Sequence, residues 1–205
     1  DGSVTYRRGP RAVDVLRLGA SGLRHYRWNE CAMVFQSALN ALNPVIKVRD
    51  QFLDVAAAHG MSDRRAAEAR TLELLRLVQL DADRVAGSYP HELSGGMRQR
   101  VAIARAMAFK PRILLYDEAT TGLDPITATT VDEEVVKLRD LEGVSSIVVT
   151  HQLRDAFFVA THEAVRDGGR VRVVPADEQK SDEAEFIMLK EGVLTFEGNA
   201  HELRT

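Results

Sequence analysis

The sequence contains few of the features that mark secreted, membrane-spanning or nucleic-acid-binding proteins. A single cysteine, Cys31, excludes an internal disulfide and suits a reducing compartment. No apolar run approaches the roughly 20 residues that cross a bilayer, so association with a membrane would need a partner. The 27 basic and 30 acidic residues give a net charge of −3, which provides no positive field for nucleic acid. A composition that is 45% hydrophobic and 28% charged over 205 residues predicts a globular protein with a sizeable core.

One short segment gives the strongest chemical signal. Residues 93–100 read Leu-Ser-Gly-Gly-Met-Arg-Gln-Arg. Ser94 can cap a helix that begins here, while Gly95 and Gly96 leave backbone N–H groups uncovered at the positive end of the helix dipole. A helix start of this kind binds phosphate. The alternative interpretation is a glycine loop followed by an ordinary capped helix.

Two apolar runs of strand length place polar residues at the edge of a predicted parallel sheet. Ile113–Tyr116 is followed by Asp117 and Glu118, and Ser146–Thr150 is followed by His151. A predicted helix between the two runs makes them a βαβ unit, and ligands of open α/β sheets bind at the carboxyl ends of the strands. Each feature alone would fit a solvated strand end, but together they predict a site.

These motifs resemble those of the ATP-binding cassette (ABC) ATPases, in the family's order and with compatible spacings. The segment at Ser94 resembles the Leu-Ser-Gly-Gly-Gln signature of that family, with Met97 where the family usually has Gln. The resemblance implies that Ser94, Gly95, Gly96 and Met97 bind ATP that is held by the opposite subunit of a pair.

The same resemblance assigns roles to the polar residues at the ends of the strands. Asp117 would hold Mg²⁺ and Glu118 would activate the attacking water, because phosphoryl transfer depends on positioning and on charge neutralisation. His151 resembles the switch histidine that contacts the γ-phosphate. Asp124 lies in a D-loop-like segment and would reach the partner subunit. Gln36 resembles the Q-loop glutamine, which takes part in catalysis, ligates Mg²⁺ and reports the nucleotide state to a membrane partner.

The phosphate-binding loop of the family, G-x-x-x-x-G-K-[ST], does not occur in the sequence. Gly19–Gly22 lacks the lysine, and Asp1–Val4 resembles the hairpin that follows that loop in the family. We therefore expect the chain alone to bind ATP weakly, to be inactive, and to leave an apolar sheet edge uncovered beside Ile113–Tyr116. A truncated product, an incomplete sequence and a degenerate paralogue would share this pattern.

The predicted fold is a single α/β domain, an N-terminally truncated ABC ATPase core of the P-loop NTPase type with an inserted helical subdomain. Residues 1–36 would form strands leading to the Q-loop, and residues 37–107 would form the helical subdomain with the signature motif. Residues 108–205 would form the α/β core and end in a hairpin. Within them, residues 166–185 depart from the family pattern, and their polar composition favours a solvated loop over a docking element.

The resemblance implies an ATP-hydrolysing subunit of an ABC transporter, with ATP and Mg²⁺ as cofactors. It would pair with a second ATPase subunit, as a homodimer or heterodimer, and lie on the cytoplasmic face of the inner membrane through transmembrane permease subunits. We expect no nucleic-acid partner.

The transported substrate stays open at this point. Residues 27–30, 33–36 and 42–44 resemble the ATPases of dipeptide and oligopeptide importers, whereas residues 116–205 look more like those of Mce-type lipid transporters. Peptide import is favoured because residues 37–46 lie beside the expected permease groove. The alternatives are a soluble ABC protein outside transport and a catalytically inactive fragment.

Overall fold

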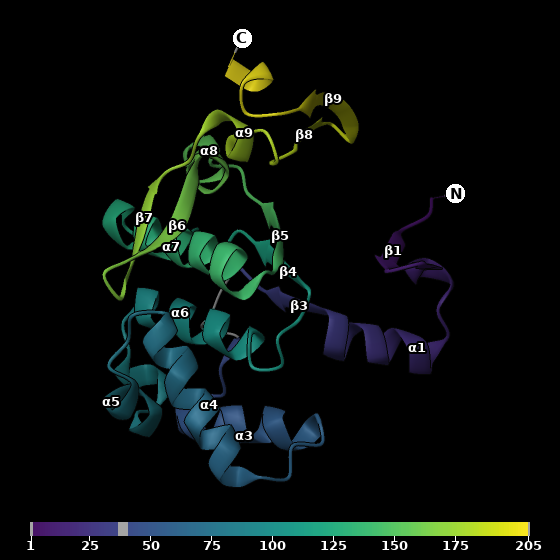
Figure 1. The fold of residues 1–205 in the computed structure, drawn as a ribbon. Helices are drawn as coiled ribbons and strands as arrows, with labels where there is room; N and C mark the ends of the chain where they lie inside the picture. The colour runs from purple at the N-terminus through teal and green to yellow at the C-terminus, as the bar shows by residue number, and fades with distance from the viewer. Residues whose placement is uncertain (1, 37–40, 205) are drawn as a thin grey trace.

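The computed structural model describes residues 2–36 and 41–204. A parallel three-stranded sheet of order β3-β4-β5 lies at the centre of Figure 1, and the three other strand pairs are antiparallel hairpins. The strands are β1 (Thr5–Arg8), β2 (Arg11–Asp14), β3 (Cys31–Val34), β4 (Ile113–Asp117), β5 (Ser145–Val149), β6 (His162–Asp167), β7 (Arg170–Pro175), β8 (Phe186–Lys190) and β9 (Val193–Gly198). The α-helices are α1 (Ala20–His25), α3 (Val48–Ala58), α4 (Arg64–Leu77), α5 (Ala82–Gly87), α6 (Gly95–Ala106), α7 (Pro125–Glu142), α8 (Leu153–Thr161) and α9 (Glu178–Ser181). Short turns of other helix types are η1 (Val15–Arg17), η2 (Tyr26–Glu30), η3 (Pro90–Glu92) and η4 (Glu202–Arg204).

The central sheet has β4 as its middle strand. Leu114 and Tyr116 alternate along β4 and are buried, as expected of a strand whose side chains pack against helices. Helix α6 contacts β3 and α7 contacts β5, so the two helices pack on the sheet and on each other. The predicted βαβ unit is confirmed, and the carboxyl ends of β4 and β5 lie side by side.

The helical part below the sheet in Figure 1 consists of α3, α4 and α5, which pack on one another, and α4 also packs against α6. Helices α3 and α4 lie within residues 37–107, where the sequence predicts helical structure. Asp63 caps α4, since its carboxylate accepts hydrogen bonds from the backbone N–H groups of Arg65 and Ala66. Leu74 and Leu75 of this helix are fully buried, which joins the helical part to one continuous core.

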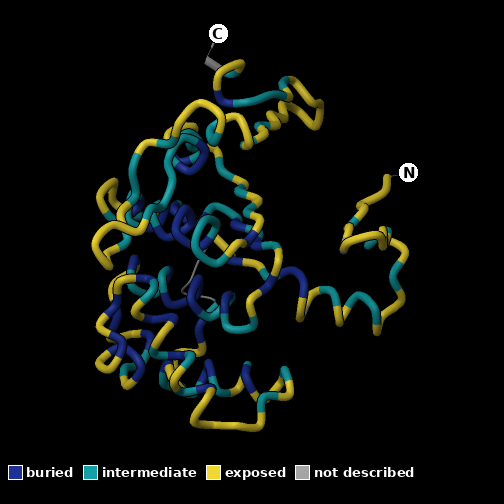
Figure 2. The backbone as a smooth tube through the Cα atoms, viewed as in Figure 1, coloured by how far each residue is buried: buried dark blue, intermediate teal, exposed yellow. Residues whose placement is uncertain are grey.

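The N-terminal arm, residues 2–30, extends away from the body and is mostly exposed (Figures 1 and 2). It contains the β1–β2 hairpin and α1. The Tyr6 hydroxyl donates a hydrogen bond of 2.6 Å to Glu30, and the rings of Tyr6 and Tyr26 meet edge to face with centroids 5.3 Å apart. These contacts tie the hairpin to the segment that enters β3.

Residues 166–185 do not form the solvated loop predicted from their composition. They continue the β6–β7 hairpin, whose turn at Gly168 and Gly169 has positive φ at both positions (55° and 82°), as a tight hairpin requires. Ala164 and Val173 pack against the core. The N–H of Ala164 donates to Asp140 of α7, and Arg139 donates to the His162 carbonyl, so α7 holds the hairpin in place.

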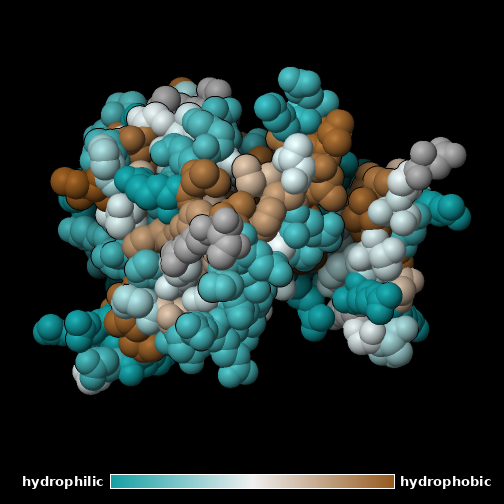
Figure 3. All heavy atoms as spheres, turned by 90° about the horizontal axis from the view of Figure 1, so that it is seen from above, coloured by the Kyte–Doolittle hydropathy of each residue, from teal (hydrophilic) through white to brown (hydrophobic). Residues whose placement is uncertain are grey.

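Ile113–Tyr116 forms the middle strand, and the apolar edge predicted beside it lies on its neighbours, the edge strands β3 and β5. That segment is in β4, which is hydrogen-bonded to a strand on each side. On β5, Ile147 and Val149 are 51% and 56% exposed. Exposed Leu189 and Val193 lie on the β8–β9 hairpin, and the upper face of the molecule shows hydrophobic atoms gathered among polar ones (Figure 3).

Two buried carboxyl groups interact between α7 and α8. Asp132 is 4% exposed and Asp155 is 2% exposed. Burial and the charge of Asp155 raise the pKa of Asp132 to about 7, although Arg154 lowers it. Two carboxyl groups can share a hydrogen bond only if one of them is protonated. The raised pKa assigns that proton to Asp132. Asp155 also accepts a hydrogen bond of 2.5 Å from the Thr120 hydroxyl.

We expect Asp132→Asn to stabilise the fold at pH 8 by about 1 kcal/mol or more and to stabilise it less at pH 5. The pKa of Asp132 is higher in the folded state than the roughly 3.9 of an unfolded aspartate. The folded state therefore binds more protons, and stability is lost as the pH rises from about 4 through 7. Urea unfolding at both pH values measures the difference, with Asp54→Asn, at an exposed carboxylate of α3, as control. An equal effect of Asp132→Asn at both pH values would contradict the assignment.

Candidate functional site

The turn after β4 places Glu118 opposite the residue that follows β5. Glu118 has φ of 50°, a left-handed conformation that is uncommon for residues other than glycine. Its backbone N–H donates a 2.9 Å hydrogen bond to the Val149 carbonyl, which ties this strained residue to β5. The Glu118 side chain is thereby directed toward His151.

Glu118 and His151 form a close pair. The His151 Nδ1 lies 2.8 Å from Glu118 Oε1 and 2.7 Å from Oε2, and the His151 backbone N–H donates to Oε1 at 3.1 Å. Thr121 donates its hydroxyl to Oε2 at 2.6 Å. Desolvation raises the pKa of Glu118, but the hydrogen bonds from Thr121 and His151 outweigh it and hold the pKa below its ordinary value. An ionised carboxylate only accepts, so Nδ1 carries the proton and Nε2 is left for another ligand.

Asp117 and Gln36 line one hollow of about 510 Å³ between the end of β3 and α6, together with Phe35 and Arg105. A carboxylate and an amide oxygen are ligands that Mg²⁺ accepts, and Mg²⁺ usually takes one or two protein oxygens and completes its shell with water and phosphate. Within residues 2–36 and 41–204, no group of three or more His, Cys, Asp or Glu could hold a metal ion. The donor set therefore fits a Mg²⁺ ion that arrives with a phosphate.

The start of α6 has the capped geometry predicted from the sequence. Ser94 is its N-cap, and its hydroxyl oxygen accepts a hydrogen bond of 3.3 Å from the Met97 N–H. Ser94 and Gly95 are exposed, whereas Gly96 is buried. The Met97 side chain is partly buried and packs against the hydrophobic core. The exposed part of this helix start is thus Ser94 and Gly95.

The start of α7 lies against the start of α6. Asp124 caps α7 by accepting from the N–H groups of Ile126 and Thr127 at 3.2 and 3.1 Å. The Thr127 hydroxyl donates to the same carboxylate, and these hydrogen bonds lower the pKa of Asp124. A Cβ atom on Gly96 would meet Thr127 Cγ2 at 2.1 Å, so the two helix starts are in direct contact.

The predicted site residues therefore fall into two groups. One contains Gln36 and Asp117 at the hollow and, one residue further along the chain from Asp117, the pair of Glu118 and His151. The other brings the residues of the α6 start together with Asp124 of the α7 start.

Sequence reasoning missed Thr121 and Thr127, which hold carboxylates of the two groups. A threonine three residues after a capping aspartate is a signal that could have found Thr127. Nothing comparable marks Thr121, because its contact depends on the left-handed turn at Glu118.

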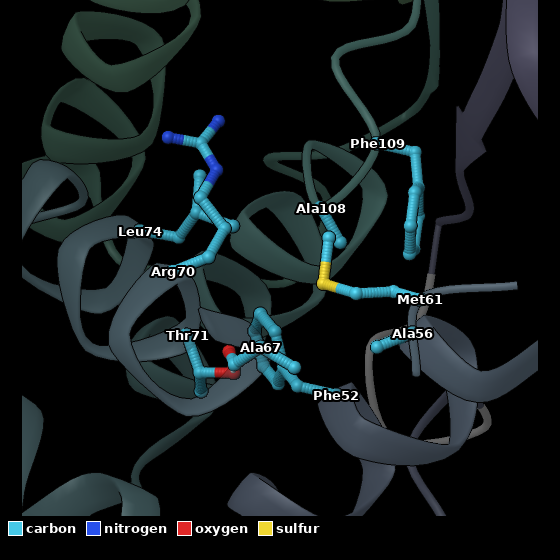
Figure 4. A pocket seen from close by; sticks show the side chains of 9 residues that line it. All are labelled: Phe52, Ala56, Met61, Ala67, Arg70, Thr71, Leu74, Ala108 and Phe109. Atoms are coloured by element: carbon cyan, nitrogen blue, oxygen red, sulfur yellow. The ribbon is translucent and has the colours of Figure 1, made fainter. Parts of the chain in front are cut away.

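A second hollow lies between α3, α4 and the segment after α6 (Figure 4). Its lining includes Phe52, Met61, Arg70 and Phe109, and its volume is about 10 Å³. That space holds about one water molecule, so we assign no ligand to it.

Comparisons with known proteins show which family the chain is similar to. The profile of the ABC transporter family matches residues 15–121, which include Gln36, the Ser94 segment, Asp117 and Glu118. A putative peptide import ATP-binding protein of Brucella ovis is 38% identical over 172 residues, which are 83% of this chain and 51% of that protein. A dipeptide transport ATP-binding protein of Caldanaerobacter subterraneus subsp. tengcongensis is 39% identical over 163 residues, 78% of this chain and 50% of that protein. The chain thus spans about half the length of the curated relatives it matches.

Solved structures show the same fold. The ATP-binding cassette MJ0796, a dimer in a post-hydrolysis state bound to ADP and Pi, is 30% identical with a TM-score of 0.63, covering 80% of this chain and 71% of that one. The cassette cbiO1 of Clostridium perfringens has a TM-score of 0.69 at 22% identity, covering 91% of this chain and 63% of that one, and supports the fold alone. The predicted α/β fold of ABC ATPase cassettes is confirmed, and the chain belongs to the ABC transporter family.

Proposed function

We propose that this chain belongs to the ATP-hydrolysing subunit of an ABC transporter. The observation that carries the proposal is the contact of Glu118 with His151 at the ends of two adjacent parallel strands, beside the hollow lined by Asp117 and Gln36. A base, a switch histidine and two oxygen ligands at one sheet edge are the components that phosphoryl transfer to water requires.

In the proposed reaction, Glu118 orients the attacking water and takes its proton. Its lowered pKa keeps it ionised and able to accept at neutral pH. His151 donates through Nδ1 to Glu118, which holds its ring so that Nε2 can meet the terminal phosphate. Asp117 and Gln36 would hold Mg²⁺, which neutralises phosphate charge when it is bound. The sequence contains no G-x-x-x-x-G-K-[ST] loop, so these residues alone should bind ATP weakly.

The second group of residues would act on ATP held by another subunit. Ser94, Gly95 and Asp124 are exposed at neighbouring helix starts, where N–H groups and the helix dipole favour an anion. A similar cassette is a dimer bound to ADP and Pi. We infer a head-to-tail pair in which this surface closes over the partner's nucleotide, and hydrolysis then separates the two subunits.

The relatives named as peptide and dipeptide import proteins favour peptide import over lipid transport. The membrane partner would be a permease that contacts residues 37–60, of which 37–40 lie outside the described residues. In the described part of this segment, Val45 is 77% exposed and precedes α3. No helix among the described residues is long and apolar enough to span a bilayer. From the relatives named as import proteins, we propose attachment to the cytoplasmic face of the inner membrane through the permease.

Glu118→Gln in the complete protein with its partner subunits should lower ATP turnover by about two orders of magnitude or more, because a positioned base is lost. The amide keeps the size of the side chain, so the nucleotide-bound closed pair should accumulate. Steady-state ATPase assays and size-exclusion chromatography with ATP measure both effects. Glu178→Gln, at an exposed residue of α9, is the control and should be neutral. Near-normal turnover in Glu118→Gln would remove Glu118 from this role.

Gly95→Asp should abolish hydrolysis and leave ATP affinity nearly unchanged. A Cβ atom on Gly95 meets only Leu123, at 3.7 Å, so the fold has room for a side chain. A carboxylate at this exposed helix start would repel the partner's nucleotide and block closure. Gly95→Ala is the matched control for the backbone change and should retain most of the activity. ATP affinity and hydrolysis falling together in Gly95→Asp would show that the segment binds nucleotide in its own subunit.

A further inference from the structure

One side chain, Thr127, connects the two exposed helix starts that are proposed to act on the partner's ATP. It lies in the first turn of α7, three residues after the capping Asp124. Its two branches have different neighbours. The hydroxyl donates to Asp124 Oδ2 at 2.5 Å, while the methyl group covers Gly96 at the start of α6.

The methyl contact is tight. A Cβ atom on Gly96 would lie 2.1 Å from Thr127 Cγ2, a separation that atoms do not adopt without a shift of the helix or the side chain. Gly96 is buried, although Ser94 and Gly95 beside it are exposed. The glycine is therefore needed here for the approach of α7, in addition to any access that it gives to phosphate.

The hydroxyl contact fixes the other helix start. Asp124 is exposed, and its carboxylate is held by the Thr127 hydroxyl and by two backbone N–H groups of α7. A rotation of the Asp124 side chain would break all three hydrogen bonds. The two branches of the Thr127 side chain thus connect the orientation of the Asp124 carboxylate with the position of Gly96.

We propose that Thr127 is a positioning residue that sets the α7 start against the α6 start, so that Asp124 and Ser94–Gly95 reach the partner's nucleotide site together. This rests on the proposed function, because it assigns Thr127 to closure of the ATPase pair. Neither branch of Thr127 needs to touch the nucleotide. Its effect should appear in turnover and not in the binding of ATP by the opposite subunit.

Two variants separate the branches in the complete protein with its partner subunits. Thr127→Val keeps a methyl on Gly96 and removes the hydroxyl, and should lower kcat about tenfold with KM for ATP unchanged, as expected for loss of a hydrogen bond to a charged group. Thr127→Ser keeps the hydroxyl and loses only the methyl contact with Gly96, and should lower kcat by less than Thr127→Val does. Wild-type kcat in Thr127→Val, or equal losses in the valine and serine variants, would overturn the proposal.

A rescue experiment tests the methyl contact. Gly96→Ala should lower kcat strongly because the new methyl meets Thr127, and the double variant Gly96→Ala with Thr127→Ser should recover activity because the opposing methyl is gone. Equal activity of the single and double variants would overturn the contact.

A measurement without hydrolysis distinguishes this inference from the proposed function. In the chain itself, the carboxyl ¹³C titration of Asp124 should show a pKa below the ordinary range, and Thr127→Val should raise it. An Asp124 pKa that Thr127→Val leaves unchanged would overturn the inference, whereas a wild-type complex without ATPase activity would overturn the proposed function.

Discussion

The hydrogen bond from the Glu118 N–H to the Val149 carbonyl is the constraint on which the site depends. It extends the pairing of β4 with β5 by one residue and holds Glu118 in a left-handed conformation. If Glu118 were extended like the rest of β4, its side chain would point to the face of the sheet opposite to that of Asp117. The observed turn instead brings the Glu118 carboxylate to His151 and leaves Asp117 at the hollow with Gln36.

Helix α7 connects this sheet edge to the rest of the molecule. Its interior carries a buried ion pair, with Lys137 Nζ 3.0 Å from Glu134 Oε1, and Asp132, whose pKa burial and the neighbouring Asp155 raise. Buried pairs contribute little net stability, but the loss of one partner leaves an uncompensated charge. The ion pair lies within α7, whereas the contact of Asp132 with Asp155 joins α7 to α8 and restricts how the two helices pack. The position of α7 sets where Asp124 and Thr127 lie at its start. It also sets where the β6–β7 hairpin lies, because Arg139 and Asp140 near the end of α7 bind that hairpin.

Much of the fold could be predicted because its signals are local. Apolar runs marked β4 and β5, and the capping residue Ser94 marked the start of α6. The sequence did not predict the β6–β7 hairpin, because polar residues such as Arg166 and Arg170 make the segment polar on average. The alternation of Val171 and Val173, which is typical of a strand, is short beside them. The partners of individual site residues depend on contacts between segments far apart in the chain. The pairing of Glu118 with His151 could be expected only at the level of a shared edge, and the contact of Gly96 with α7 left no mark in the sequence.

The most direct test of this account is a structure of the complete protein with its partner subunits, Mg²⁺ and a non-hydrolysable ATP analogue. The account predicts that Asp117 and Gln36 lie at the metal ion, with the Glu118 carboxylate and the His151 Nε2 facing the terminal phosphate. It also predicts that Ser94 and Gly95 of the opposite subunit cover the same nucleotide. A nucleotide bound away from the Glu118–His151 pair, or in contact with Ser94 and Asp117 of one and the same subunit, would contradict it.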